Sequence, residues 1–165
     1  MFTINNNLDN SAYAYMDWNK IKAGNQLRLR ENYRKTGRSL FDNDGLADIF
    51  GRKVIACTDK FGNVGEEIEV TFKYPVPYWN PSKGTLFAII GDIKNQNEPN
   101  CNEWGHLYSQ GTQCCVVEFI VNSSKINNIK DRFPLLKKNP VIKIEKTGVN
   151  FFNKIDEFLS GKNIF

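Results

Sequence analysis

Two carboxylates lie where the sequence otherwise predicts buried strands. Asp92 ends the apolar run FAIIGD, and Glu118 interrupts the run CCVVEFIVN. A buried carboxylate is costly unless it is paired, hydrogen-bonded or protonated. Two carboxylates whose surroundings separate their pKa values are typical equipment for cleaving a glycosidic bond. The alternative is structural: Glu118 pairs with Lys94 or Arg52, and Asp92 caps the loop after its strand.

Polar and aromatic residues follow the first of these carboxylates directly. Lys94 and Asn95 come next, and Trp104 and the single histidine, His106, lie further along the same polar stretch. An aromatic platform with ammonium, amide and imidazole donors is typical of a carbohydrate site. These four residues are therefore our candidates for substrate binding. Cys101 could act as a nucleophile with His106, but no recognisable nucleophile context surrounds it.

Motifs for a bound cofactor or metal are absent from the sequence. The chain lacks the glycine-rich nucleotide loops, the HExxH helix and a complete EF-hand loop. The segment DNDG, residues 42–45, starts like a calcium loop, but Lys53 stands where that loop needs an acidic residue. We therefore expect no cofactor and no metal.

The four cysteines do not have the spacing of a structural zinc site. Cys57, Cys114 and Cys115 lie in apolar runs and are interpreted as small core residues. Cys101 lies in a polar stretch, so a disulfide to Cys114 or Cys115 is the alternative if the protein works outside a cell.

Length and composition indicate one globular domain. The chain has 165 residues, of which 41% are hydrophobic and 24% charged. No apolar run approaches the roughly 18 residues of a membrane span, and residues 1–10 lack the features of a signal peptide. We expect no membrane partner, and a protein that stays in the cytoplasm or leaves the cell by a route without a signal.

A basic segment, LRLRENYRKTGR over residues 27–38, dominates the net charge of +4. It is interpreted as a solvated helix or loop face. Contact with a polyanion, including a cell-wall polymer, is an alternative. A nucleic-acid partner is disfavoured because the chain has no zinc-finger spacing, helix-turn-helix pattern or RNA-binding aromatic motif.

Apolar patterning predicts a helix, then strands, then a second helix. The segment SAYAYMDWNKI has near-helical spacing, with Ser11 as its N-cap and Gly24 as its end. Strands are expected over KVIACT, EEIEVTFKY, TLFAIIGD, CCVVEFIVN and NPVIKIEKTG. The segment NFFNKIDEFLSG predicts an amphipathic helix closed by Gly161.

Short strands joined by loops of uneven length predict a mainly β fold, a small β-barrel with helical additions. We expect a single domain over residues 1–165. In it, a helical and loop extension over residues 1–50 packs on a barrel over 51–148, and a helix lies within 149–165.

The order of these segments resembles a known group of proteins. AYMDWNKI, GRKVIACTDKFGNVGEEIEVTF, GTLFAIIGDIKN and VVEFIV are similar to a series found in short proteins of Firmicute phages and in their tail or wall-lytic proteins. That group in turn resembles the double-psi β-barrel of lytic transglycosylases and of the three-aspartate domain of cell-wall enzymes. The resemblance covers residues 13–122.

The resemblance also implies roles for three carboxylates. IACTD places Asp59 near the first acid of the three-aspartate domain, IIGDIKN places Asp92 at the second, and VVEFIV places Glu118 where an aspartate is expected. It implies action on peptidoglycan or another cell-wall polymer, with Asp92 protonating the glycosidic oxygen and Glu118 as its partner. The Gly-Gly that follows the acid in that domain is replaced here by Ile-Lys-Asn. A non-catalytic structural or binding module, such as a tail component that contacts other virion proteins, is the alternative.

Overall fold

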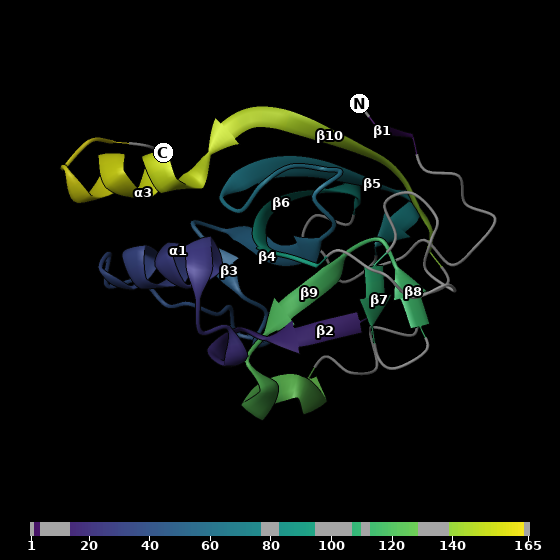
Figure 1. Ribbon diagram of the computed structural model, residues 1–165, viewed down its shortest axis with the longest axis horizontal. Coiled ribbons are helices and arrows are strands. Elements are labelled where there is room, and N and C mark those ends of the chain that lie inside the picture. Colours follow the sequence, from purple (N-terminus) through teal and green to yellow (C-terminus); the bar gives the residue numbers. More distant parts are fainter. Residues whose placement is uncertain are drawn as a thin grey trace.

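A curled β-sheet forms the centre of the protein. The computed structural model describes residues 2–3, 14–76, 83–94, 107–109, 113–128 and 139–163. Eight strands make one sheet that curls into a half-barrel, and two α-helices lie together at one end of it (Figure 1). The prediction of a mainly β, barrel-like fold with helical additions is confirmed at this level.

Strand order in the sheet differs from chain order. The strands of the sheet are β1 (Phe2–Thr3), β2 (Ala14–Asp17), β3 (Asp48–Ile49), β4 (Arg52–Cys57), β5 (Glu66–Val76), β6 (Lys83–Ile93), β9 (Glu118–Val121) and β10 (Val141–Asn150). They follow the order β1-β10-β5-β6-β4-β9-β2, with β3 paired to β4. The β4–β6 and β2–β9 pairs are parallel, and the others are antiparallel. Strands β7 (Leu107–Ser109) and β8 (Gln113–Cys115) form a separate antiparallel pair.

The five predicted strands overlap observed ones, namely β4, β5, β6, β8 with β9, and β10, whereas β1, β3 and β7 were not predicted. The apolar run CCVVEFIVN, expected as one strand, is divided between β8 and β9, because Val116 and Val117 lie in neither strand. In β5, the side chains of Ile68, Val70 and Phe72 are buried together inside the curl of the sheet. Alternation along the strand therefore identifies its buried face correctly.

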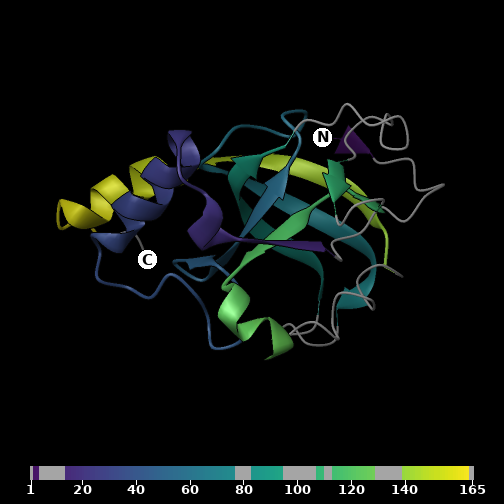
Figure 2. The same cartoon turned by 60° about the horizontal axis from the view of Figure 1, so that its bottom comes forward.

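Both faces of the central strands are covered. Phe119 and Val121 of β9 belong to the core inside the curl, whereas Ile120 belongs to a second core that includes residues of both α-helices. Figure 2 shows these helices beside the end of the sheet. All four residues of β9 are buried, which confirms that Glu118 lies on a strand covered on both sides.

The predicted placement of the first helix is wrong. Residues 14–17 form strand β2, and a short 3-10 helix, η1 (Trp18–Lys20), follows it. The helix α1 (Gly24–Arg34) begins at Gly24, where the prediction ended a helix. Pairing of β2 with β9 therefore outweighs the near-helical spacing of its apolar residues.

The second helix is confirmed. Helix α3 (Phe151–Leu159) begins after Asn150, whose side chain accepts hydrogen bonds from the backbone N–H of Phe152 and Asn153. Gly161 follows with φ of 84°, a backbone conformation that favours glycine. A second short 3-10 helix, η3 (Ser123–Asn128), follows β9. Within the described ranges, no helix combines the length and apolar character needed to cross a membrane.

Candidate functional site

Asp92 and Glu118 flank one residue of the central strand β4. Ala56 is the register partner of Asp92 on β6 and of Glu118 on β9. Neighbouring strands lie about 4.8 Å apart, so the backbones that carry the two carboxylates are roughly 10 Å apart. The fold therefore brings together two residues that are 26 positions apart in the sequence.

A bulge at Gly91 sets the position of Asp92. Ile55 pairs with Ile90, but the next residue of β4 pairs with Asp92, so Gly91 is an extra residue in β6. A Cβ atom at position 91 would overlap Val54 Cγ1 and lie 2.9 Å from Ile120 Cδ1, so the site admits only glycine without rearrangement. Bulges of this kind change the direction in which the next side chain points.

The carboxyl group of Asp92 is largely withdrawn from water. The residue is 8% exposed, and this burial raises its pKa. A hydrogen bond from the backbone N–H of Ile93 and the charge of Lys94 oppose the shift without cancelling it. The group is therefore held closer to its protonated form than an exposed aspartate would be.

Glu118 is buried beside a cation. It is 1% exposed, and its Oε1 lies 3.7 Å from Nζ of Lys94, whose side chain is 34% exposed. That separation is an ion pair and is too long for a hydrogen bond. Arg52, the other partner considered for Glu118, instead pairs with Glu67 at 3.0 Å. The partly exposed Lys94 thus pairs with Glu118, and its charge also acts on Asp92, so the three residues form one polar group.

Of the remaining predicted site residues, the structure describes Asp59. Asp59 is exposed in the turn that follows β4. Asn95, Trp104 and His106 lie outside the described residues, as does Cys101. From the predicted set, the structure therefore brings together Asp92, Glu118 and Lys94.

Two cysteines near this group are buried free thiols. Burial raises the pKa of Cys57, and the charges of Asp92, Asp59 and Glu66 raise it further. Burial also raises the pKa of Cys115, as does the charge of Glu118. The core interpretation of both residues is confirmed. The alternative disulfide between Cys101 and Cys115 is not formed, because Cys115 is free. Thiols with such raised pKa values are poor nucleophiles.

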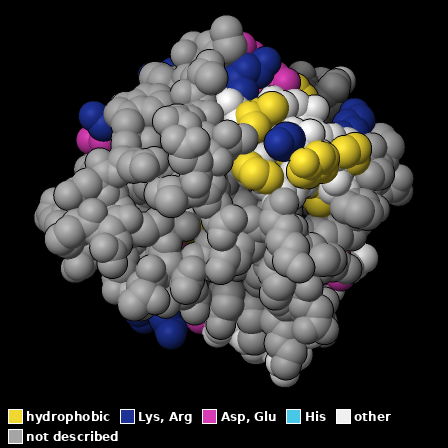
Figure 3. All heavy atoms as spheres, turned by 90° about the vertical axis from the view of Figure 1, so that its right-hand side faces the viewer, with side chains coloured by type: hydrophobic (Ala, Val, Ile, Leu, Met, Phe, Trp, Pro, Cys, Tyr) yellow, Lys and Arg dark blue, Asp and Glu magenta, His cyan; other side chains and the backbone are white. Residues whose placement is uncertain are grey.

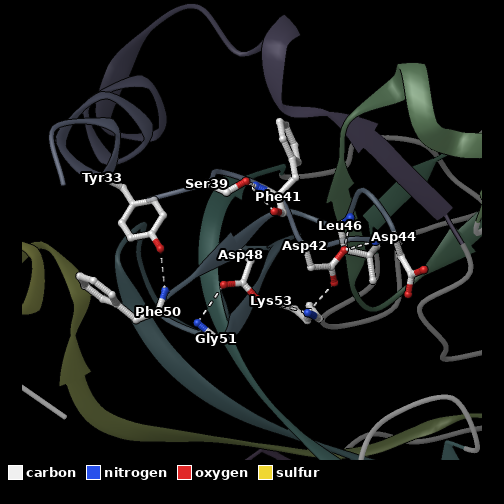
Figure 4. Close-up of polar contacts among 10 residues, drawn as sticks. All are labelled: Tyr33, Ser39, Phe41, Asp42, Asp44, Leu46, Asp48, Phe50, Gly51 and Lys53. Atoms are coloured by element: carbon white, nitrogen blue, oxygen red, sulfur yellow. Dashed lines mark hydrogen bonds and ion pairs between the residues drawn. The ribbon is translucent and has the colours of Figure 1, made fainter. Parts of the chain in front are cut away.

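A second polar cluster was not predicted from the sequence. Lys53 Nζ lies 2.6 Å from Asp42 Oδ2 and 3.3 Å from Asp48 Oδ2 (Figure 4). Burial alone would lower the pKa of Lys53, but hydrogen bonds and charges of the two aspartates raise it overall. In the sequence, this cluster is indicated by a lysine at the second position of an apolar strand, with acidic residues in the segment before it. In the described part of the chain, no three His, Cys, Asp or Glu side chains gather as a metal site would require.

The basic segment packs on the protein itself. Arg30 is buried, and its Nη1 donates to the backbone carbonyl of Trp18. The guanidinium of Arg28 lies 4.2 Å from the centre of the Phe152 ring, and that of Arg38 lies 5.4 Å from the centre of the Phe50 ring. The segment is thus not simply a solvated face, since three of its arginines contact other elements.

Comparison with known proteins gives no relative. No protein-family model, no curated protein and no solved structure matches the chain.

Proposed function

We propose that the protein is a non-catalytic binding module for a cell-wall polymer. The observation that carries this proposal is the ion pair between Lys94 and Glu118, with Glu118 only 1% exposed. A carboxylate that acts on a glycosidic bond must reach the polymer or a water beside it. Glu118 is instead committed to a cation inside the fold, so its role is to stabilise the sheet.

A double-psi-like barrel is the fold we propose for this module. The four segments that carry the resemblance to that fold include β4, β5, β6 and β9. These strands are consecutive neighbours in the sheet, in the order β5-β6-β4-β9. Segments matched by their spacing and order as much as by residue identity therefore form one continuous part of the sheet, which supports the proposal.

A polymer of the bacterial cell wall is the proposed partner. The net charge of +4 favours an anionic polymer, and the resemblance to phage tail and wall-lytic proteins points to peptidoglycan and to contacts with other virion proteins. Hydrophobic side chains surround a basic one on the face shown in Figure 3. Tyr74 and Phe87 are exposed aromatic residues, with Lys73 and Arg52 lying 5.5 and 5.9 Å from the centres of their rings. Exposed aromatic and basic groups of this kind suit contact with a polymer surface.

Glycosidic cleavage is the second candidate function. Two observations favour it: burial raises the pKa of Asp92, as a general acid requires, and Asp92 and Glu118 flank the same residue of β4. In this mechanism Asp92 protonates the leaving oxygen, and Glu118 acts as the second carboxylate. It requires Glu118 to be released from Lys94 when the polymer binds.

Incubation with purified cell-wall sacculi separates the two functions. We expect the wild-type protein to sediment with sacculi and to release no muropeptides. The variants Asp92→Asn and Glu118→Gln should sediment as well as the wild type if their circular dichroism shows that they are folded. Release of muropeptides by the wild type and its loss in Asp92→Asn would establish the enzyme, whereas a protein that stays in the supernatant would refute the binding module.

A further inference from the structure

A cavity of about 450 Å³ opens between the end of α1 and the segment that leads into β3. It lies towards the start of β4, where Lys53 is, whereas the Asp92 and Glu118 group lies towards the end of that strand. Ligand sites in proteins have volumes of about 300–1,000 Å³, so a single ring-sized molecule fits here. Its lining includes Tyr33, Arg38, Phe41, Asp42, Asn43 and Asp48.

Two carboxylates in the wall of the cavity are held rigidly. Asp42 Oδ1 accepts hydrogen bonds from the backbone N–H of Asp44 and of Leu46, both at 2.9 Å. Asp48 Oδ1 accepts one from the N–H of Gly51 at 2.8 Å. Lys53 bonds the second oxygen of each carboxylate. A carboxylate has about four acceptor positions, so both groups keep capacity for a further donor.

The charges around the cavity cancel. Asp42 and Asp48 carry two negative charges, and Lys53 and Arg38 carry two positive ones. A cationic ligand would compete with Lys53, which already lies within hydrogen-bonding distance of both aspartates (Figure 4). An anionic ligand would be repelled by the two carboxylates, because Lys53 is already paired with both of them. The balance therefore favours a neutral ligand that donates hydrogen bonds.

A buried hydroxyl group in the same wall has an unused donor. Tyr33 is 1% exposed, and its Oη accepts a hydrogen bond from the backbone N–H of Phe50 at 3.1 Å. Among the residues that the structure describes, no acceptor takes the hydroxyl proton of Tyr33. A buried donor left without a partner is costly, so a ligand oxygen in the cavity would satisfy it.

An aromatic ring completes the set of lining groups. Phe41 is half-buried in the cavity wall, and the edge-to-face contact with Trp18, with ring centres 5.9 Å apart, fixes its position. The side chain of Asn43 is exposed at the mouth, where its amide can both donate and accept. Rigid acceptors, a donor, an amide and an aromatic face together match a ring that carries hydroxyl groups on its edge and C–H groups on its face.

We propose that this cavity binds one neutral sugar residue of a larger glycan. Asp42 and Asp48 accept hydrogen bonds from its hydroxyl groups, Tyr33 donates to a ring or hydroxyl oxygen, and Phe41 packs against the ring. The inference rests on the proposed function, because it assigns the sugar-binding site of the polymer-binding module.

Titration of the isotope-labelled full chain tests the inference by NMR. The probes are the neutral trisaccharide of N-acetylglucosamine, inorganic phosphate as an anion and spermidine as a cation. We expect the trisaccharide to produce saturable shifts in the backbone amide signals of residues 38–51, and neither charged probe to do so. Saturable binding of phosphate or spermidine at these residues, or no binding of the trisaccharide, would overturn the proposal.

Three variants locate the binding. Asp48→Asn keeps an oxygen for the Gly51 N–H and removes the charge, and Asn43→Ala changes only an exposed side chain. We expect each to weaken trisaccharide binding, by about tenfold for Asp48→Asn and about fivefold for Asn43→Ala. Asn153→Ala, on the exposed side of α3, is the control and should bind as the wild type does. Unchanged affinity in both cavity variants would refute the site.

The sedimentation assay distinguishes this inference from the function on which it rests. If sacculi retain the wild type and both cavity variants equally, the polymer-binding function holds and the cavity is not its site. If the trisaccharide binds at residues 38–51 but sacculi do not retain the protein, the sugar site holds and the cell-wall function is wrong.

Discussion

Lys94 reaches Glu118 from the end of β6, so that one partner of the pair is partly in water and the other is inside the sheet. Nζ of Lys94 lies 3.7 Å from Oε1 of Glu118, and the exposed fractions of the two side chains are 34% and 1%. Removal of Lys94 would leave a carboxylate that is shielded from solvent. Removal of Glu118 would leave an ammonium group that solvent can still reach. The two substitutions should therefore have unequal costs.

Lys94→Met should lower the free energy of unfolding by about 3 kcal/mol, since loss of the cation from a buried ion pair is strongly destabilising. The figure is at the low end for such pairs because Lys94 itself is partly solvated. Urea denaturation at neutral pH measures the difference. Adding Glu118→Gln to this variant should recover part of the loss, because the buried charge is then gone.

The control for this prediction is Lys60→Met. Lys60 is exposed in the turn after β4, so its loss should change stability by less than about 0.5 kcal/mol. If Lys94→Met is no more destabilising than Lys60→Met, the ion pair does not stabilise the fold, and the structural role proposed for Glu118 is wrong.

Asp92→Asn should remove a pH dependence of stability. Burial raises the folded-state pKa of Asp92 above its unfolded value, so the folded protein binds the proton more tightly. The wild type therefore loses stability as the pH rises from the unfolded pKa to the raised folded pKa, and the loss levels off above it. The difference between Asp92→Asn and wild type should grow over that window, in favour of the variant. Urea midpoints from about pH 3 to pH 7 measure it, and a difference that is constant with pH would contradict the shift.

Local patterns in the sequence predict the strands and the last helix because each depends on its own residues. The alternation in β5 and the capping residues Asn150 and Gly161 of α3 are of this kind. The pairing of β2 with β9 is different, since it joins residues about 100 positions apart and overrides the helical spacing of Ala14–Asp17. No local pattern carries that information.

The candidate site likewise has a part that the sequence predicts and a part that depends on the sheet. The sequence marks Asp92 and Glu118 as unusual because charged residues in apolar runs are visible locally. It leaves the partner of Glu118 open between Lys94 and Arg52, because that choice depends on how the strands are ordered in the sheet. The cluster of Asp42, Asp48 and Lys53 was missed for the same reason, since β3 must pair with β4 before these side chains meet.

Gly91→Ala should lower the free energy of unfolding by about 1–3 kcal/mol. The added methyl group overlaps Val54 Cγ1 and lies 2.9 Å from Ile120 Cδ1, both buried. The bulge cannot relax away from these atoms without changing the pairing of β4 with β6. Thermal and urea unfolding measure the loss.

Gly84→Ala in the same strand is the matched control for this substitution. Its Cβ would meet no atom closer than 3.4 Å, so we expect a change of less than about 0.5 kcal/mol. Val54→Ala combined with Gly91→Ala should be less destabilising than the sum of the two single changes, because the removed methyl groups make room for the new one. Additive losses would show that the overlap with Val54 is not the cause.

Arg30→Met and Arg34→Met make the same change of charge in α1 and should differ in stability. The side chain of Arg30 is 9% exposed, and its Nη1 donates to the carbonyl of Trp18, which the substitution leaves without this donor. We expect a loss of about 1–3 kcal/mol. Arg34 is 55% exposed and pairs with Glu31 at 3.3 Å on the helix surface, so its loss should cost less than about 0.5 kcal/mol. Equal losses would mean that the basic segment acts only through its charge. The expected inequality instead assigns Arg30 to the contact between α1 and η1 and Arg34 to the exposed surface of α1.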